Sequence, residues 1–188
     1  MTEHQFLIVD KPTFFRFAAA APENMRCEYV RGRIVQQMAG GTRKHAMLAQ
    51  RLVKVIDRTI DPGRWIVLGS DRAVETSETI RYPDIVVEPS AGQDNSLATK
   101  EPALVIEILS QSSEERDLDI KPLEYLSIPS LFAYIVVDQD TPRFVVWYRA
   151  TDGRFPALPT IIEGTDAVVE VPELTIRIPL TEIYQGIA

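Results

Sequence analysis

The chain contains little of what defines several common classes of protein. Cys27 is the only cysteine among 188 residues, so an intrachain disulfide is impossible and a zinc site built from several cysteines is excluded. No segment approaches the roughly 18 consecutive apolar residues of a membrane-spanning helix, and residues 1–10 lack a basic stretch followed by an apolar one. We therefore expect a cytoplasmic protein with no signal peptide and no membrane partner.

Positive charge and phosphate-binding loops are also scarce. The formal net charge is -7, which argues against a protein that coats nucleic acid through bulk electrostatics. The imbalance is uneven, because residues 1–60 carry 10 Lys and Arg against 5 Asp and Glu, so a locally basic surface can still exist. No glycine-rich loop is followed by Lys-Ser or Lys-Thr, so nothing supports a nucleotide-driven enzyme.

What the chain does have is an ordinary globular composition, 45% hydrophobic and 25% charged. Its length suits a single domain, which we expect to span residues 1–188. Apolar patterns predict strands near residues 33–38, 65–68, 72–75, 84–88 and 103–109, a hairpin of strands 132–138 and 143–149, and a terminal hairpin over 168–178. Together with two helical segments, this order predicts an α/β (α+β) domain with a mixed sheet and flanking helices.

The two helical segments have recognisable starts. Residues 43–58 have apolar residues at helical spacing, and Thr42 is a candidate N-cap. The opposite face carries a basic stripe made of Lys44, Arg51, Lys54 and Arg58. Such a stripe is usually a solvated helix face, although it would contact phosphates if it faced a site. A second helix should open at Ser112, which has capping-box spacing to Glu115, and Pro122 should kink or divide it.

The most informative residues are two carboxylates and a lysine. Asp84 begins one apolar run, Glu107 lies inside the most apolar run of all, and Lys121 follows in the second helical segment. A buried carboxylate is costly unless a cation compensates it. A divalent metal ion shared by Asp84 and Glu107 would do so, with the carbonyl of Ile108 as a third oxygen ligand. Lys121 would then orient a water molecule or bind a phosphate, which is the arrangement of a metal-dependent nuclease.

Each residue also has a simpler interpretation. Asp84 after Pro83 is a common turn or strand-end residue, Glu107 could form a structural salt bridge, and an isolated lysine is most often solvated. A glycosidase-like hydrolase with two carboxylates and no metal is a further alternative, but no aromatic cluster near either acid favours it. The combination of acid, acid and lysine in this order is more specific than any single member.

Four segments together form a recognisable set: residues 28–35 (EYVRGRIV), 81–87 (RYPDIVV), 102–110 (PALVIEILS) and 128–138 (IPSLFAYIVVD), with His45, Asp117, Lys121 and Tyr125 between them. This set resembles the Uma family of PD-(D/E)XK endonuclease-like proteins. The resemblance implies a restriction-endonuclease-like fold, a Mg²⁺ or Mn²⁺ site, DNA as the substrate, and a homodimer. It also implies that Asp84 and Glu107 are the metal ligands.

The resemblance assigns the remaining site residues by their position. The lysine that usually lies two residues after the second acid is absent, because Leu109 stands there, and the family pattern places it at Lys121. Glu28 matches an acidic residue that often completes such sites. His45 matches a position near the same pocket, although by itself it would be read as a core or interface histidine.

Two hypotheses from different classes therefore remain. The first is a Mg²⁺- or Mn²⁺-dependent endodeoxyribonuclease, in which Asp84 and Glu107 converge in an open cleft. The second is a catalytically silent nuclease-like fold that binds nucleic acid or protein, in which Glu107 pairs directly with Lys121 in a closed core. Trp65, Trp147 and Tyr148 are assigned to the core or a dimer interface rather than to base stacking.

Overall fold

The structure is a computed structural model that describes residues 8–22, 25–37, 41–92, 95–109 and 116–187. Its larger sheet has the strand order β11-β10-β9-β8-β6-β3. These strands are β3 (Trp65–Gly69), β6 (Ile85–Pro89), β8 (Leu104–Ile108), β9 (Ala133–Val137), β10 (Arg143–Tyr148) and β11 (Thr160–Glu163). Only β8 and β9 run parallel among these neighbours, so the sheet is mixed, as predicted.

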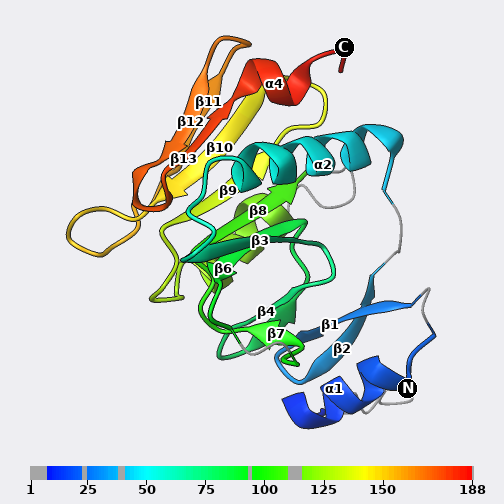
Figure 1. The fold of residues 1–188 in the computed structure, drawn as a ribbon. Coiled ribbons are helices and arrows are strands. Elements are labelled where there is room, and N and C mark those ends of the chain that lie inside the picture. Colours follow the sequence, from blue (N-terminus) through cyan, green and yellow to red (C-terminus); the bar gives the residue numbers. More distant parts are fainter. Residues whose placement is uncertain (1–7, 23–24, 38–40, 93–94, 110–115, 188) are drawn as a thin grey trace.

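A smaller sheet with the order β2-β1-β5-β4-β7 is built mainly from the N-terminal part of the chain (Figure 1). Its strands are β1 (Arg26–Val30), β2 (Arg33–Gln37), β4 (Ala73–Glu75), β5 (Thr79–Arg81) and β7 (Ala98–Thr99). Helix α1 (Lys11–Ala20) packs on this sheet through Phe14, which is fully buried against Tyr29 and Ile80. The smaller sheet therefore has a hydrophobic cluster of its own.

The two faces of the larger sheet are covered by different elements. Helix α2 (Arg43–Asp57) lies across one face, together with the hairpin of β12 (Val168–Val171) and β13 (Ile176–Pro179), the short turn η2 (Pro172–Leu174) and helix α4 (Leu180–Tyr184). The opposite face carries a π-helical turn, η1 (Arg116–Ile120), and helix α3 (Lys121–Tyr125). Within the described ranges, no helix is both long enough and apolar enough to cross a membrane.

Strand β8 distributes its side chains between these two faces. Ile106 and Ile108 pack in the cluster under α2, whereas Val105 packs in the cluster under α3. Because side chains alternate along a strand, Glu107 points with Val105 toward α3. Strand β8 therefore places the Glu107 carboxylate on the face of the sheet that carries Lys121.

Several sequence predictions are confirmed. Helix α2 begins after Thr42, whose hydroxyl accepts a hydrogen bond from the His45 amide at 3.1 Å, as expected for an N-cap. Both predicted hairpins form, as β9-β10 and β12-β13. The segment around Pro122 is divided into η1 and α3, as expected for a proline that removes a helical donor. The proposed capping box at Ser112 and Glu115 lies outside the described residues.

Other elements were not predicted. Helix α1 was not predicted because Phe14 is its only buried residue, so the helix lacks a repeating apolar face. Strands β5 and β7 have three and two residues, too short for a period of two to be recognised. These elements depend on their neighbours rather than on a local pattern.

Candidate active site

Asp84 and Glu107 lie opposite each other where strands β6 and β8 part. The strands are antiparallel with Ile85 paired to Ile106, so the same register continued by one residue places Asp84 across from Glu107. Oδ2 of Asp84 accepts a hydrogen bond from the Ile108 amide at 2.7 Å. This bond ties the residue that precedes β6 to the end of β8.

Glu107 is held by two donors from α3. Nζ of Lys121 donates to Oε1 of Glu107 at 2.6 Å, and the Tyr125 hydroxyl donates to the same oxygen at 3.3 Å. Lys121 and Tyr125 are four residues apart and therefore share one face of the helix. Pro122 stands in the first turn of α3, where proline is tolerated, so it does not turn the lysine away from the acid.

Tyr125 acts on Glu107 only as a hydrogen-bond donor. Burial, and next the negative charge of Glu107, raise the pKa of Tyr125 well above its usual value. The hydroxyl therefore keeps its proton at neutral pH. A carboxylate that receives both a charged and a neutral donor is held in one orientation.

His45 approaches Asp84 from the first turn of α2. Its Nε2 lies 3.2 Å from Oδ2 of Asp84. The two side chains are 21% and 19% exposed, against 5% for Glu107 and 6% for Lys121, so solvent reaches the site from the Asp84 side. Gly41 makes room for the imidazole, because a Cβ at this position would lie 3.0 Å from Nδ1 of His45.

Ile108 contributes its backbone. In a strand, the N–H and C=O of one residue point to the same edge, and the amide of Ile108 donates to Asp84. The amide of the next residue, Leu109, donates to Val137 on the other side. The Ile108 carbonyl is therefore directed toward the edge where Asp84 lies, which suits its predicted role as an oxygen ligand.

Glu28 lies beside the site, and its hydrogen bonds go to Arg81 and Tyr82 rather than to Asp84 or Glu107. Oε2 of Glu28 accepts from Nη1 of Arg81 at 2.7 Å, and Oε1 accepts from the Tyr82 amide at 3.4 Å. Arg81 also donates from Nε and Nη2 to the two oxygens of Glu124 on α3, at 2.8 and 2.7 Å. Glu28 makes no hydrogen bond with Asp84 or Glu107, whose positions are both within the described residues.

Arg81 and Glu124 are site residues that the sequence reasoning missed. Burial by itself would lower the pKa of Arg81, but the hydrogen bonds and charges of Glu124 and Glu28 outweigh it and raise that pKa further. The guanidinium is therefore a permanent charge. Its only signal in the sequence is its place three residues before Asp84, in the segment 81–87.

The donor set fits a hard divalent ion only as a minimal site. Among the described residues, no group of three or more His, Cys, Asp or Glu side chains is arranged to hold a metal ion. Four acidic side chains nevertheless accompany two basic ones in the described part of this cluster, namely Glu28, Asp84, Glu107 and Glu124 with Arg81 and Lys121. Mg²⁺ usually takes one or two protein carboxylates and completes its shell with water and phosphate oxygens. Asp84, Glu107 and the Ile108 carbonyl match this coordination preference.

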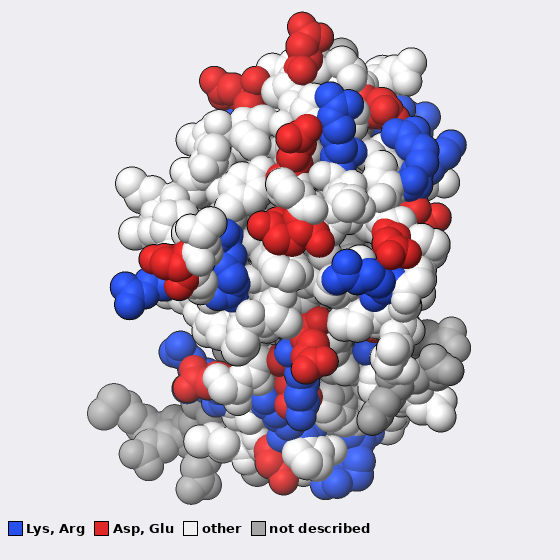
Figure 2. Space-filling model, turned by 60° about the vertical axis from the view of Figure 1, so that its left-hand side comes forward, with Lys and Arg blue, Asp and Glu red and all other residues white. Residues whose placement is uncertain are grey.

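The N-terminal excess of basic residues is partly neutralised in the folded structure. Five of these cations pair with acids from beyond residue 60, as Lys11–Glu75, Arg26–Asp71, Arg31–Glu78, Lys44–Asp140 and Arg58–Glu182. Figure 2 shows the result on one face, where the coloured Lys and Arg side chains are interspersed with Asp and Glu. The basic stripe of α2 behaves likewise, because Arg51 donates to the Ile183 carbonyl and Arg58 pairs with Glu182 of α4. It anchors the C-terminal helix.

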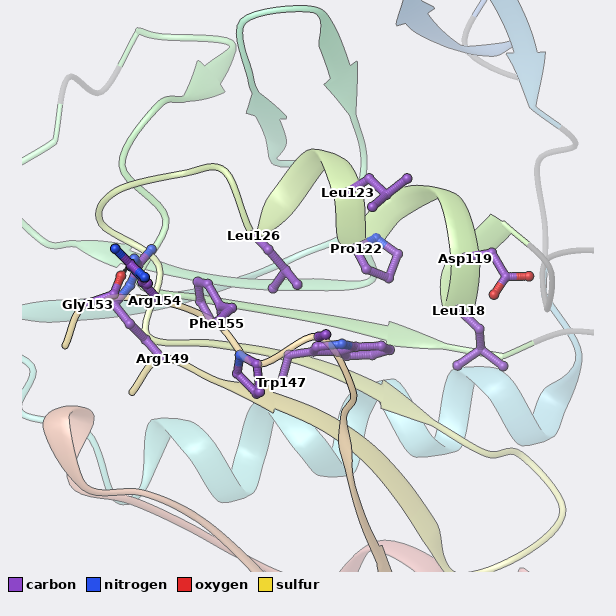
Figure 3. Close-up of a pocket in the computed structure, with 12 residues that line it drawn as sticks. Leu118, Asp119, Pro122, Leu123, Leu126, Trp147, Arg149, Gly153, Arg154 and Phe155 are labelled. Atoms are coloured by element: carbon purple, nitrogen blue, oxygen red, sulfur yellow. Dashed lines mark hydrogen bonds between the residues drawn. The ribbon is translucent and has the colours of Figure 1, made fainter. Parts of the chain in front are cut away.

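Helix α3 borders a groove of about 670 Å³ (Figure 3). Pro122 and Leu126 line it from the helix, Trp147 forms its floor, and Phe155 and Arg149 close one end. Trp147 packs on Tyr134 with ring centroids 5.4 Å apart and is almost fully buried, so it belongs to the core, as predicted. The groove therefore lies between α3 and Trp147 of β10.

A mixed sheet with helices on both faces, and an acid on each of two adjacent strand segments, fits a restriction-endonuclease-like fold. The model of the Uma2 family, described as "Putative restriction endonuclease", matches residues 12–180, and the chain belongs to this family. A crystal structure described as "a putative nuclease belonging to DUF820" from Anabaena variabilis has a TM-score of 0.73 and 20% sequence identity. The match covers 92% of this chain and 97% of the other, and it establishes the fold.

Two relatives from Synechocystis sp. match at the level of sequence. "Uncharacterized protein sll1609" is 28% identical over 150 residues, which cover 77% of this chain and 83% of the relative. "Uncharacterized protein slr1290" is 27% identical over 165 residues, covering 86% and 84%. Family membership and fold together support a nuclease-like function.

Proposed function

We propose that this protein is a Mg²⁺- or Mn²⁺-dependent endonuclease that hydrolyses the phosphodiester bonds of DNA. The observation that carries the proposal is the register that sets Asp84 opposite Glu107, with Lys121 on Glu107. These are the two acids and the lysine of the family pattern. Asp84 lies across from Glu107 although 23 residues separate them, and Lys121 contacts Glu107 although it follows 14 residues later.

In this mechanism the residues of the chain have separate roles. Asp84 and Glu107 supply carboxylate oxygens and Ile108 a carbonyl oxygen for the ion. When bound, a divalent ion lowers the pKa of a water molecule and neutralises charge on the phosphate. Lys121 moves from Glu107 to a phosphate oxygen or to the attacking water, where its proton stabilises developing negative charge. Tyr125 and His45 keep Glu107 and Asp84 in orientation.

Metal binding tests the proposal without a need for the correct DNA sequence. Calorimetric titration of Mg²⁺ and Mn²⁺ should show binding to the wild type and none to Glu107→Ala or Glu107→Gln. Glu88→Gln is the matched control, since Glu88 is a buried glutamate on the neighbouring strand β6 and is paired with Arg72. Cleavage of DNA should then require the ion and be lost in Asp84→Ala. No heat of binding in the wild type, with no cleavage under either ion, would refute the enzyme.

A second candidate function rests on a specific observation. The Glu107–Lys121 pair is direct, at 2.6 Å, and both side chains are nearly inaccessible, which was the expected signature of a silent nuclease-like binding module. In that case the lysine takes the place of the metal ion. Binding of DNA or protein that is unaffected by chelators and by Glu107→Gln would favour this function.

The assembly of the enzyme is a further part of the proposal. A nuclease that cuts both strands commonly works as a symmetric dimer, and we expect a homodimer. Sedimentation velocity of the purified chain tests this directly, and a monomer at all concentrations would refute it.

A further inference from the structure

Helix α3 is too short to be stable without contacts to the rest of the protein. It has five residues, continues directly from the five-residue π-helical turn η1, and has no side-chain hydrogen bond capping it at Ile120. Helices of this length are unstable by themselves, because nucleation is not repaid by so few hydrogen bonds. One side of the helix borders the groove in Figure 3, and Leu123 is 81% exposed. The position of Lys121 and Tyr125 therefore depends on contacts with the rest of the protein.

Arg81 makes a bidentate contact with this helix. Its fork of Nε and Nη2 grips both oxygens of Glu124, and its third nitrogen, Nη1, reaches Glu28. The side chains of Arg81 and Glu28 are 4% and 2% exposed, and that of Glu124 is 10% exposed. A bidentate pair of this kind fixes geometry as well as charge, which a lysine cannot reproduce.

The location of these residues links the two halves of the site. Glu124 lies between Lys121 and Tyr125, which hold Glu107 from α3. Arg81 lies three residues before Asp84 on the same segment of chain. A change in the Arg81–Glu124 distance would therefore move α3 relative to both acids.

We propose that Arg81 is a positioning residue that sets Lys121 and Tyr125 against Glu107, and that Glu28 holds Arg81 in place. The expected effects on cleavage rest on the proposed nuclease function, whereas the placement of α3 does not. In this assignment Glu28 supports the site from β1 without contributing a ligand to the metal ion.

The test compares two buried forks with the same chemistry. Glu124→Gln weakens the fork on α3, and Glu88→Gln weakens the equally bidentate Arg72–Glu88 fork, which lies away from α3. Misplacement of a reacting group by about 1 Å costs on the order of 100-fold in rate. We expect Glu124→Gln to lower kcat by about 10- to 100-fold with little change in KM, and Glu88→Gln to leave kcat unchanged.

A second readout needs no activity. In the wild type, Lys121 should react slowly with an acylating reagent, measured by mass spectrometry of its peptide, because its side chain is buried against Glu107. Glu124→Gln and Arg81→Lys should both speed this labelling. Neither Arg81 opposite a glutamine nor a lysine opposite Glu124 can form the charged bidentate pair of the wild type. Glu88→Gln should not. If Glu124→Gln fails to fold, Glu124→Asp retains the charge, shortens the side chain, and carries the same expectation.

The outcomes separate this inference from the proposed function. Unchanged Lys121 labelling in folded Glu124→Gln and Arg81→Lys would overturn the positioning role, whether or not the protein cleaves DNA. Loss of Mg²⁺ binding in Glu28→Gln, as in Glu107→Gln, would make Glu28 a ligand and would also overturn the assignment. A wild type that neither binds Mg²⁺ nor cleaves, but shows the expected labelling, would refute the nuclease and leave the positioning role standing.

Discussion

Replacement of Lys121 by methionine is the most direct perturbation of the site. Methionine keeps most of the apolar volume of the lysine stem but removes the cation that faces Glu107. Two unit charges 2.6 Å apart attract by about 6 kcal/mol at an effective dielectric constant of about 20. Part of this attraction is offset by the desolvation of both groups, because each is only 5 or 6% exposed.

The expected loss of stability follows from that balance. Removing one partner of a buried ion pair typically costs about 3–5 kcal/mol, because the other charge stays buried without its counter-charge. Lys121→Met should therefore lower the free energy of unfolding by this amount. Lys121→Met combined with Glu107→Gln should recover most of the loss, since the buried carboxylate charge of Glu107 is then removed as well. Urea unfolding followed by circular dichroism measures both, with the exposed Lys54→Met on α2 as a control that should change stability by less than about 0.5 kcal/mol.

The same variant probes the metal site. The lysine and a divalent ion compete for Glu107, so Lys121→Met should bind Mg²⁺ more tightly than the wild type while losing cleavage. An ion at 100 times its Kd should restore about 2.7 kcal/mol of stability to the variant. The reasoning is refuted if Lys121→Met is as stable as the wild type within about 1 kcal/mol, or if the double variant is no more stable than the single one.

Three other predictions concern the surroundings of the site and the pH dependence of stability. Asp84→Asn should lose Mg²⁺ binding in calorimetry and cleavage while unfolding within about 1 kcal/mol of the wild type; retained binding would remove Asp84 from the ligand set. Gly41→Ala would place a Cβ 3.0 Å from Nδ1 of His45 and should reduce cleavage, whereas Gly69→Ala, where nothing lies within 4 Å, should not. Equal activity of the two alanine variants would show that the His45 contact with Asp84 is dispensable. Burial raises the pKa of Tyr184, so the folded state keeps this proton where the unfolded chain has lost it. Its contribution to stability is therefore complete below about pH 10 and declines as the pH rises further. Tyr184→Phe should make the decline in unfolding free energy between about pH 9 and 11 shallower, and an unchanged slope would contradict this.

The elements that the sequence predicted correctly are those specified by neighbouring residues. The strand that contains Glu107, the helix after Thr42 and the break at Pro122 could be predicted, because periodicity, capping and the missing proline donor act within a few residues. A glutamate inside an apolar strand also indicated by itself that a compensating cation was needed, and Lys121 is there.

The partners of other charged residues were not local. The family resemblance predicts Glu28 as a further site acid, and the structure pairs it with Arg81, which the sequence reasoning did not select. The N-terminal cations suggested a basic surface, yet they meet acids 45 or more residues away, such as Asp71 and Glu182. The charge of a sequence segment does not predict the charge of a surface, because basic residues of that segment can pair with acids from distant parts of the chain.

The sequence by itself determined which residues would be buried, which strand would carry a carboxylate, and to which family the pattern belongs, because hydrophobic burial and backbone chemistry are encoded residue by residue. Only the tertiary structure decided that Asp84 faces Glu107, that Lys121 reaches it from a separate helix, and that Arg81 joins that helix to the smaller sheet. Such contacts depend on strand register and on the packing of segments distant in the chain, and a charge pair buried in that way is strong only where the geometry is complete.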